Sequence, residues 1–322
     1  MKTKLSFVIP CYGSEHTISK VVDEIKKTVK TREKEFDHEI ILVSDHSPDK
    51  VFSVIEQLAS ADPHIKGIEL AGNCGQHSAI LAGFSEITGD IVVCLDDDGQ
   101  TPADQMFRLI DCLDDECDVV FARYDNKKHS FFRNFGSYVN DLMARTLIDK
   151  PKELKIMSYF ACKRYIADEV VRYKNPYPYL SGLLLRSTKN IKNVTIDHRD
   201  RLEGESGYSF KKLMNLWVNG FTSFSVKPLR AATFVGCTTS LFGFVYGIYI
   251  IINKLINPQT PLGYSSTMAA LLFVGGVIMV MLGIIGEYVG RIYISLNEAP
   301  QYVIRRTVSS GTASAKKEEK AK

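Results

Sequence analysis

The residues with the clearest capacity for chemistry are three consecutive aspartates, Asp96, Asp97 and Asp98, which follow the apolar run VVCL. If the chain is extended here, Asp96 and Asp98 project to one side and Asp97 to the other. Two carboxylates that converge at a strand end form an oxygen-rich site suited to Mg²⁺ or Mn²⁺, which usually takes further ligands from waters and substrate phosphates. The pattern therefore predicts a divalent-metal site that binds a diphosphate group.

A solvated acidic loop or a helix N-terminus is the competing interpretation of these aspartates. Residues Thr101–Asp104 are typical of a helix start, and capping would account for Thr101. Capping does not account for three adjacent carboxylates, whose mutual repulsion is unfavourable unless a cation is bound. An Asp-x-Asp pattern alone is weak evidence. Its position after a buried strand is what favours a nucleoside-diphosphate site.

Predicted strands and helices alternate along the first 124 residues, and these elements would position the aspartates. Short apolar runs rich in β-branched residues predict strands at 5–10, 39–45, 65–70, 90–96 and 118–124. Amphipathic stretches between them predict helices at 18–29, 51–59, 78–87 and 103–113. Continuous rather than alternating apolar runs indicate strands covered on both faces, so the expected fold class is α/β with a parallel sheet wrapped by helices.

Four of these strands deliver polar residues to their carboxyl ends, where ligands bind in such sheets. The segments concerned are Pro10–Gly13, Asp45–Ser47, Asn73–His77 and Asp96–Gln100. Because parallel strands end at the same edge, we expect these four segments to form one site.

Composition excludes several other classes of protein. The net charge of +3 gives no indication of nucleic-acid binding, and 24% charged with 45% hydrophobic residues excludes a disordered chain. The seven cysteines form no CxxC pair and no Cys/His metal spacing. We therefore expect buried free thiols in a reducing compartment rather than disulfides or zinc.

Two apolar segments, Ala231–Ile252 and Thr267–Gly286, contain no charged residue. Each has about the 20 residues that a helix needs to cross a bilayer, so we expect two spans at 231–252 and about 267–288. A pair of buried core helices is the weaker alternative, because soluble helices carry a polar stripe. Lys and Arg residues flank both spans on their outer sides, which favours cytoplasmic placement of both termini and of everything before residue 230. The short apolar run at the N-terminus predicts no cleaved signal peptide.

The segment Tyr208–Val226 precedes the first span and places its apolar residues at helical spacing beside Lys211 and Lys212. This pattern favours an interfacial helix on the bilayer, and a core-facing stripe is the alternative. The expected organisation is a cytoplasmic domain at 1–205, an interfacial region at 206–230, a two-helix hairpin at 231–290 and a cytoplasmic segment at 291–322. The last 14 residues are low in complexity and predict a disordered tail.

Five segments in order resemble the family 2 glycosyltransferases, in the branch that acts on polyisoprenyl phosphates. They are VIPCY (8–12), NCGQHSAILAGF (73–84), LDDDGQTP (95–102), GESGYSF with SFSVKPLR (204–230) and GEYVGRIY (286–293). The branch includes dolichol-phosphate mannose synthase, bactoprenol glucosyltransferases and undecaprenyl-phosphate formamidoarabinose transferases. The resemblance implies a GT-A fold, a Rossmann-like parallel-rich sheet domain, followed by the interfacial helix and two transmembrane helices.

The resemblance also implies roles for individual residues. Asp96, Asp98 and Gln100 match the ligands of Mg²⁺ or Mn²⁺ and the diphosphate. Pro10, Tyr12 and Asp45 match the walls of the uracil and ribose pocket, and Glu15 and Gln76 belong to the same donor-binding set. Arg123, Lys127, Lys128 and Arg133 match a cationic approach to the phosphates of the donor. His198, Arg201, Ser206 and Tyr208 match the segment that meets the lipid phosphate, and Arg201 is the one best suited to a bidentate phosphate contact.

The chain departs from the family pattern at two notable places. The family usually has Asp-Asp-Gly-Ser where Ser44–Ser47 stand, and Ser158 replaces an aspartate proposed as the catalytic base. A lipid phosphate monoester has a second pKa near 6 and is already anionic at neutral pH, so its attack needs little help from a base. We therefore expect Asp98→Ala to abolish activity and Ser158→Ala to retain a substantial fraction.

The expected function is inverting transfer of a hexose from a nucleoside-diphosphate sugar, UDP-glucose or a related UDP-sugar, to polyprenyl (undecaprenyl) phosphate. The expected location is the cytoplasmic face of a bacterial inner membrane, where the product supplies a lipid-linked sugar for cell-envelope modification. Relatives with paired spans suggest a homotetramer. The alternatives are a non-catalytic lipid-binding or scaffold descendant, a transferase for another membrane acceptor, and a processive synthase, which the absence of a QxxRW motif disfavours.

Overall fold

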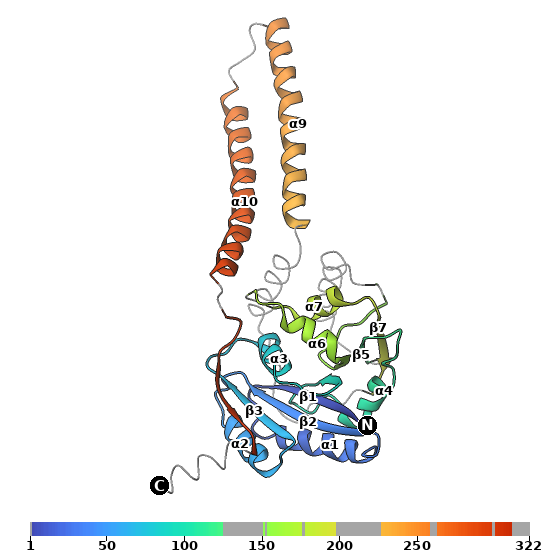
Figure 1. Ribbon diagram of the computed structural model, residues 1–322. Helices are drawn as coiled ribbons and strands as arrows, with labels where there is room; N and C mark the ends of the chain where they lie inside the picture. The colour runs from blue at the N-terminus through green and yellow to red at the C-terminus, as the bar shows by residue number, and fades with distance from the viewer. Residues whose placement is uncertain are drawn as a thin grey trace. The chain divides into compact units, whose positions relative to one another are not determined.

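The computed structural model describes residues 2–124, 151, 153–175, 178–197, 227–257, 263–297 and 300–310. The chain divides into two compact units, one comprising residues 1–210 and 298–322 and the other residues 211–297. The first unit contains a sheet with helices on its faces, and the second contains two long helices (Figure 1).

Within the described residues, eight strands form one mixed sheet in the order β7-β5-β6-β4-β1-β2-β3-β8. They are β1 Thr3–Cys11, β2 Phe36–Ser44, β3 Ile65–Leu70, β4 Ile91–Cys94, β5 Val119–Arg123, β6 Phe160–Lys163, β7 Ile191–Thr195 and β8 Ile304–Val308. The four central strands β3, β2, β1 and β4 are parallel, whereas β6 and β8 each pair antiparallel with their neighbours. The predicted α/β class with a parallel-rich sheet is confirmed.

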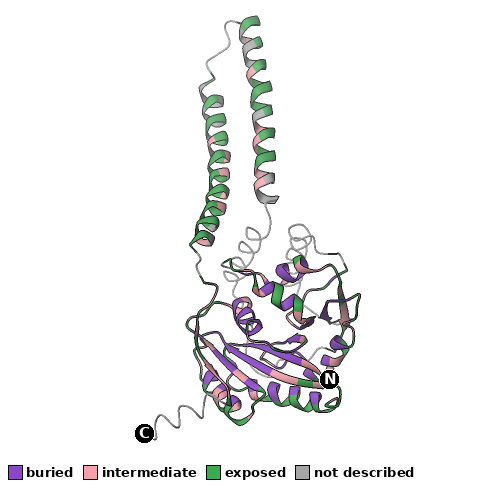
Figure 2. Ribbon diagram, in the orientation of Figure 1, coloured by how far each residue is buried: buried purple, intermediate pink, exposed green. Residues whose placement is uncertain are grey.

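Helices cover both faces of this sheet. They are α1 Ile18–Lys30, α2 Val51–Ala61, α3 Gln76–Phe84, η1 Ala103–Gln105, α4 Met106–Ile110, α6 Arg164–Val171 and α7 Leu180–Ser187. Helices α1 and α2 lie on one face and α3 on the other (Figure 1). The strands between these layers are almost wholly buried (Figure 2), as their continuous apolar runs predict.

Close packing of α3 depends on Gly83. A Cβ at this position would lie 2.4 Å from Cγ1 of Val8 and 3.2 Å from Cγ2 of Val43. Any larger residue would push the helix away from β1 and β2. Glycine therefore sets how near the carboxyl end of α3, which ends at Phe84, can lie to β1 and β2.

Several boundaries differ from the sequence prediction. The fourth strand ends at Cys94 rather than at residue 96, and the helix expected at 103–113 is divided into η1 and α4. Strands β6, β7 and β8 were not predicted, because each is only four or five residues long and its pairing partner is distant in sequence. The cysteines, which we expected to be buried free thiols, are free thiols of varied burial: four are buried, whereas Cys112 is half-buried and Cys74 and Cys237 are exposed.

Strand β8 returns the chain to the first unit after the long helices. It pairs antiparallel with β3, and Arg306 makes 2.7 Å ion pairs with both Glu69 and Glu56. The Arg306 guanidinium also lies 4.2 Å from the ring centroid of Phe52. Residues 304–308, which we expected to be a simple cytoplasmic segment, are therefore part of the sheet. Of the tail predicted to be disordered, residues 309–322, all but the first two lie outside the described residues.

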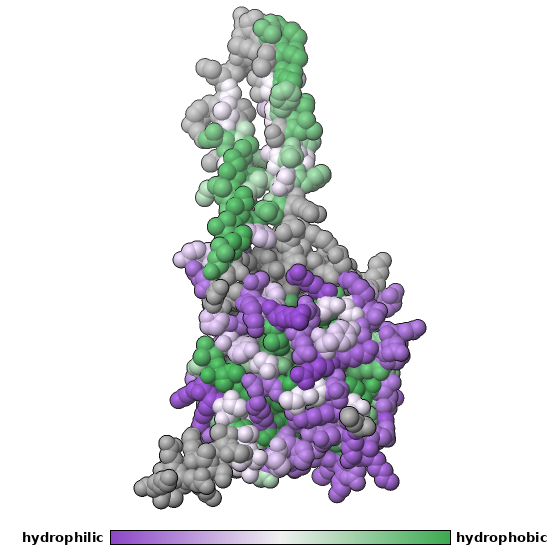
Figure 3. All heavy atoms as spheres, viewed as in Figure 1, coloured by the Kyte–Doolittle hydropathy of each residue, from purple (hydrophilic) through white to green (hydrophobic). Residues whose placement is uncertain are grey.

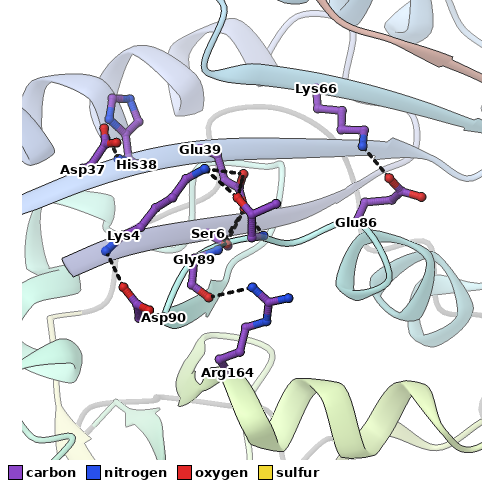
Figure 4. A network of polar contacts seen from close by, with 11 residues as sticks. Lys4, Ser6, Asp37, His38, Glu39, Lys66, Glu86, Gly89, Asp90 and Arg164 are labelled. Carbon is purple, nitrogen blue, oxygen red and sulfur yellow. Dashed lines mark hydrogen bonds and ion pairs between the residues drawn. The ribbon is translucent and has the colours of Figure 1, made fainter. Parts of the chain in front are cut away.

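The amino ends of three parallel strands are joined through Glu39 (Figure 4). Its carboxylate accepts hydrogen bonds from Ser6 Oγ and Thr88 Oγ1, both at 2.6 Å, and pairs with Lys4 Nζ at 3.0 Å. Burial alone would raise the pKa of Glu39, but these bonds outweigh burial and lower it to about 2. This edge of the sheet is opposite the carboxyl ends of the same strands and serves stability.

The second unit contains α9 Lys227–Ile256 and α10 Tyr264–Leu296. Their apolar stretches, Ala232–Tyr249 and Phe273–Ile294, are long and apolar enough to cross a membrane and are not buried by other parts of the protein. Figure 3 shows the hydrophobic residues along both helices. The predicted spans at 231–252 and 267–288 fall within these helices. The predicted interfacial helix Tyr208–Val226 lies outside the described residues.

Candidate active site

The site is formed by the loops that follow β1, β2, β3 and β4. These strands are parallel neighbours, so their carboxyl ends meet at one edge. Each loop contains one residue with a positive φ angle, and within the described residues these are the only four: Gly13, His46, Gly75 and Gly99. Each loop therefore turns sharply where the strand ends.

Hydrogen bonds connect these loops to one another. The Gly13 amide donates to Ser47 Oγ at 2.8 Å, which ties the β1 loop to the β2 loop. The Tyr12 amide donates to Oδ2 of Asp97 at 2.9 Å, which ties the β1 loop to the β4 loop. The sequence prediction that these strand ends gather into one cluster agrees with these contacts.

Asp96 accepts a side-chain hydrogen bond on each of its two carboxylate oxygens. Its Oδ1 accepts a 2.9 Å hydrogen bond from Gln76 Nε2, and its Oδ2 accepts a 2.5 Å hydrogen bond from Ser158 Oγ. Burial raises the pKa of Asp96 to about 6, and repulsion from Asp98 and Asp97 adds to this, while the two hydrogen bonds oppose it. Three half-buried carboxylates therefore lie close enough to repel one another at this site.

The Asp97 carboxylate is held by other partners than the Asp96 carboxylate, and the backbone here differs from the one that the sequence predicted. The chain is not extended through residue 98, because it bends at residues 97–99 and Gly99 has a φ of +75°. Asp97 is instead directed by the amide of Tyr12, and its own carbonyl accepts a 2.7 Å bond from Thr17 Oγ1. The prediction of an extended chain through these three aspartates is therefore wrong.

Asp98 lies on the bend that follows β4. Its Oδ1 accepts a 2.9 Å hydrogen bond from the Gln100 amide, so the carboxylate stabilises its own turn. Tyr124, which follows β5, lies near the same charges: burial and the carboxylates of Asp96 and Asp98 raise the pKa of its phenol to about 12. Sequence reasoning missed Tyr124, although its place at a strand end was the available signal.

Asp45 is buried at the end of β2, with 4% of its surface exposed. Its two carboxylate oxygens accept hydrogen bonds from the amides of Cys74 at 2.7 Å and Gly75 at 2.8 Å. Burial raises the pKa of Asp45, and these amides partly offset the rise. In the structure Asp45 holds the loop that leads into α3. The additional contact with a uracil or ribose stays a prediction.

The other predicted residues near this edge vary in exposure. Pro10 is buried in β1, whereas the Tyr12 side chain is 53% exposed. Glu15 accepts a 2.9 Å bond from the Lys50 amide, which ties the β1 loop to the start of α2. Arg123 is exposed at the end of β5. Their contacts with a donor nucleotide stay predictions.

The remaining predicted residues are the acceptor-side set and three of the four cationic residues expected to approach the phosphates. Lys127, Lys128, Arg133, His198, Arg201, Ser206 and Tyr208 all lie outside the described residues. Their roles stay predictions drawn from the sequence. The carboxylate cluster and its supports are what the structure contributes to the site.

The carboxylate cluster fits a divalent cation, because carboxylate oxygens are ligands that Mg²⁺ and Mn²⁺ bind. Within the described ranges, no three acidic, histidine or cysteine side chains converge to hold a metal by themselves. Mg²⁺ and Mn²⁺ sites in nucleotide enzymes commonly use one or two carboxylates and complete the shell with substrate phosphates and water. Asp96 and Asp98 supply two carboxylates, and a cation would relieve the repulsion that raises the pKa of Asp96.

A known protein family matches the part of the chain that contains both the central strands and the carboxylate cluster. The sequence matches Glycosyl transferase family 2 over residues 6–172, which runs from β1 to the end of α6 and includes all four site loops. The chain belongs to glycosyl transferase family 2. The GtrB C-terminal hairpin family matches residues 227–292, which include α9 and most of α10. The family expected from the sequence motifs is thus confirmed.

Individual family 2 relatives align over nearly the whole chain. An uncharacterized glycosyltransferase of Bacillus subtilis (strain 168) is 32% identical over 308 residues, covering 94% of this chain and 93% of that protein. The undecaprenyl-phosphate 4-deoxy-4-formamido-L-arabinose transferase of Klebsiella pneumoniae (strain 342) is 30% identical, covering 99% and 98%. The glucosyl-3-phosphoglycerate synthase of Mycobacterium tuberculosis in complex with UDP, a solved structure, aligns with a TM-score of 0.49 and 16% identity, covering 68% and 79%.

Proposed function

We propose that this glycosyltransferase moves a hexose from a UDP-linked sugar to a polyprenyl phosphate in a single inverting displacement. The observation that supports the chemistry best is the Asp96 carboxylate, held by Gln76 and Ser158 beside two further aspartates. The choice of acceptor is supported by relatives named as undecaprenyl-phosphate transferases, which align over 95–99% of this chain.

The displacement involves two bonds at the anomeric carbon. An oxygen of the lipid phosphate attacks C1 of the sugar as the bond from C1 to the nucleoside diphosphate breaks, so the configuration at C1 inverts. The phosphate monoester carries its nucleophilic oxygen as an anion near neutral pH, with a second pKa of about 6. No covalent intermediate with the enzyme forms, and no side chain needs to remove a proton.

The protein contributes positioning and charge. Asp96 and Asp98, with Gln100 beside them, are the residues that would hold Mg²⁺ or Mn²⁺. When bound there, the cation supplies positive charge that stabilises the departing diphosphate. Tyr12, whose exposed ring follows β1, and the loop around Asp45 flank the position where the donor nucleoside would lie. Holding donor and acceptor in line is the larger part of the task.

The proposed location is the cytoplasmic face of a bacterial inner membrane, with α9 and α10 as its two spans. The pairing of β8 with β3 supports this topology, because the chain leaves the sheet domain before α9 and rejoins the same sheet after α10. Two membrane crossings return the chain to the side from which it started, and this connection requires that return. Basic residues outside both spans favour the cytoplasm for that side.

The test is transfer of radiolabelled sugar into an organic phase by purified protein, undecaprenyl phosphate and Mg²⁺ or Mn²⁺. The donor panel comprises UDP-glucose, UDP-galactose, a UDP-N-acetylhexosamine and a UDP-4-amino sugar, with UDP-glucose first. We expect one donor to be used, with activity abolished by EDTA and restored by the metal. Absence of transfer from every donor would refute the proposal. Mass measurement of the detergent-solubilised protein tests the proposed homotetramer.

A further inference from the structure

Two neutral side chains from different elements hold the Asp96 carboxylate. Gln76, the first residue of α3, donates to Oδ1 at 2.9 Å. Ser158, two residues before β6, donates to Oδ2 at 2.5 Å. Both carboxylate oxygens are therefore oriented by side chains of the protein itself.

We propose that Ser158 and Gln76 are positioning residues that set the orientation of the Asp96 carboxylate toward a divalent cation. Ser158 then acts through Asp96 rather than on the acceptor, although its place in the sequence is that of a proposed base. This inference rests on the metal centre of the proposed function and assigns the two residues that organise it.

The chemistry of the two donors suits this role. Each carboxylate oxygen has two lone pairs, so a bond from Ser158 or Gln76 leaves capacity for a cation. Both donors are uncharged, so they direct Asp96 without cancelling the negative charge that attracts the metal. A lysine or arginine in either place would neutralise that charge. Partners that orient metal-binding carboxylates commonly affect metal affinity 10–100-fold.

Gln76 is held in place by the loop that precedes it. The amides of Cys74 and Gly75 donate to the two carboxylate oxygens of Asp45, at 2.7 and 2.8 Å. Gly75 has a φ of +86°, which turns the chain directly into α3. A continuous series of contacts therefore runs from β2 through this loop to Gln76 and Asp96.

Ser158 is held in place by the residue that follows it. Tyr159 is 1% exposed, and its hydroxyl donates to the carbonyl of Pro102 at 3.1 Å. The Tyr159 carbonyl accepts a 3.0 Å bond from the amide of Ala122 on β5. Because both the hydroxyl and the carbonyl of Tyr159 are hydrogen-bonded, the adjacent backbone is held where the Ser158 hydroxyl reaches Asp96.

The experiment measures Mn²⁺ affinity directly, by electron paramagnetic resonance of free Mn²⁺, with and without UDP. Full-length wild-type protein in detergent is compared with Ser158→Ala, Ser158→Thr and Gln76→Ala. We expect the two alanine variants to bind Mn²⁺ about 10–100-fold more weakly, and Ser158→Thr to stay within about threefold because it keeps the hydroxyl. Ser60→Ala, on the exposed face of α2, is the matched control and should bind as wild type does.

Activity as a function of metal concentration separates positioning from base catalysis. If Ser158 positions Asp96, Ser158→Ala approaches the wild-type rate once Mn²⁺ is saturating, and its pH profile is unchanged. A loss of rate that persists at saturating Mn²⁺ with an altered pH profile would overturn the inference.

The affinity measurement also distinguishes this inference from the proposed function. Equal Mn²⁺ affinities of wild type and Ser158→Ala, with both proteins folded by circular dichroism, would overturn the inference alone. Failure of the wild-type protein to bind Mn²⁺ would overturn the metal centre and the inference together. Failure to transfer sugar despite Mn²⁺ binding that weakens in Ser158→Ala would refute only the proposed function.

Discussion

Asp98 and Asp96 differ in the contacts that hold them. Asp96 is oriented by side chains from α3 and from the segment before β6, whereas Asp98 accepts a bond from the Gln100 amide two residues along its own turn. Asp98 thus stabilises its local bend, and its carboxylate is the second of the two proposed for the cation. Removing it tests the metal centre through a carboxylate that neither Gln76 nor Ser158 is shown to contact.

Asp98→Ala is expected to reduce transfer below about 1% of the wild-type rate. Metal stabilisation of a leaving group contributes several kcal/mol, and each 1.4 kcal/mol is about tenfold in rate. The measurement is labelled sugar in the organic phase at saturating donor and Mn²⁺. Ser158→Ala under the same conditions should retain a substantial fraction. Near-total losses in both variants would show that Ser158 takes part in the chemistry.

At the scale of elements, Glu39 on β2 predicts a pH dependence of stability (Figure 4). Its folded-state pKa, about 2, lies below the ordinary value of 4.5. The carboxylate therefore contributes its full stabilisation above about pH 4.5, and the contribution is lost as the pH falls through about 2. Glu39→Gln should lower the free energy of unfolding at neutral pH by about 2 kcal/mol, because it removes the charged acceptor of several bonds.

Urea unfolding followed by circular dichroism at several pH values measures this effect. The variant should also show a shallower fall in stability than the wild type between about pH 4.5 and pH 2. Glu35→Gln is the matched control, because Glu35 is exposed and its ion pair with Arg32 is screened by solvent. A Glu39→Gln protein as stable as this control would refute the role assigned to the network.

Gly67 tests the packing of β8 on the sheet. A Cβ at this position in β3 would lie 2.4 Å from Cγ2 of Ile55 in α2 and 2.6 Å from Cγ2 of Val308 in β8. Gly67→Ala is therefore expected to lower the free energy of unfolding by about 1–3 kcal/mol, as overpacking of a core commonly does. Thermal or urea unfolding of the full-length protein in detergent measures the change.

Gly72 provides the control for this substitution. It follows β3 in the same part of the chain, and among the described residues no heavy atom lies within 4 Å of a Cβ built there. Gly72→Ala should leave stability nearly unchanged. Equal effects of the two substitutions would mean that β8 does not pack over Gly67 in solution.

At the scale of the whole molecule, the connection from the sheet through α9 and α10 to β8 predicts the membrane topology. Both ends of the helical hairpin should lie on the side of the sheet domain, with the loop between the helices on the other side. Asn257→Cys should react with a membrane-impermeant maleimide added to intact spheroplasts. Ser309→Cys should react only after the membrane is permeabilised. Labelling of Ser309→Cys in intact spheroplasts would contradict the proposed topology.

Much of this architecture follows from local features of the sequence. Apolar runs and amphipathic stretches predicted the strands and helices that form the site, because periodicity reflects which faces are buried. The gathering of Asp45, Gln76 and Asp96 at one edge followed from parallel strand order alone. The two apolar helices followed from their length and lack of charge. These properties depend on neighbouring residues, so they can be read along the chain.

Only the tertiary structure decided which groups meet. Ser158 lies 62 residues from Asp96, and Arg306 lies 237 residues from Glu69, yet each pair is in hydrogen-bond contact. The bend at residues 97–99 likewise overrode the extended geometry that the sequence suggested. Such contacts depend on how packing places distant segments of backbone within a fraction of an ångström. No local preference carries that information, so the sequence alone identified the chemical groups and the fold determined their partners.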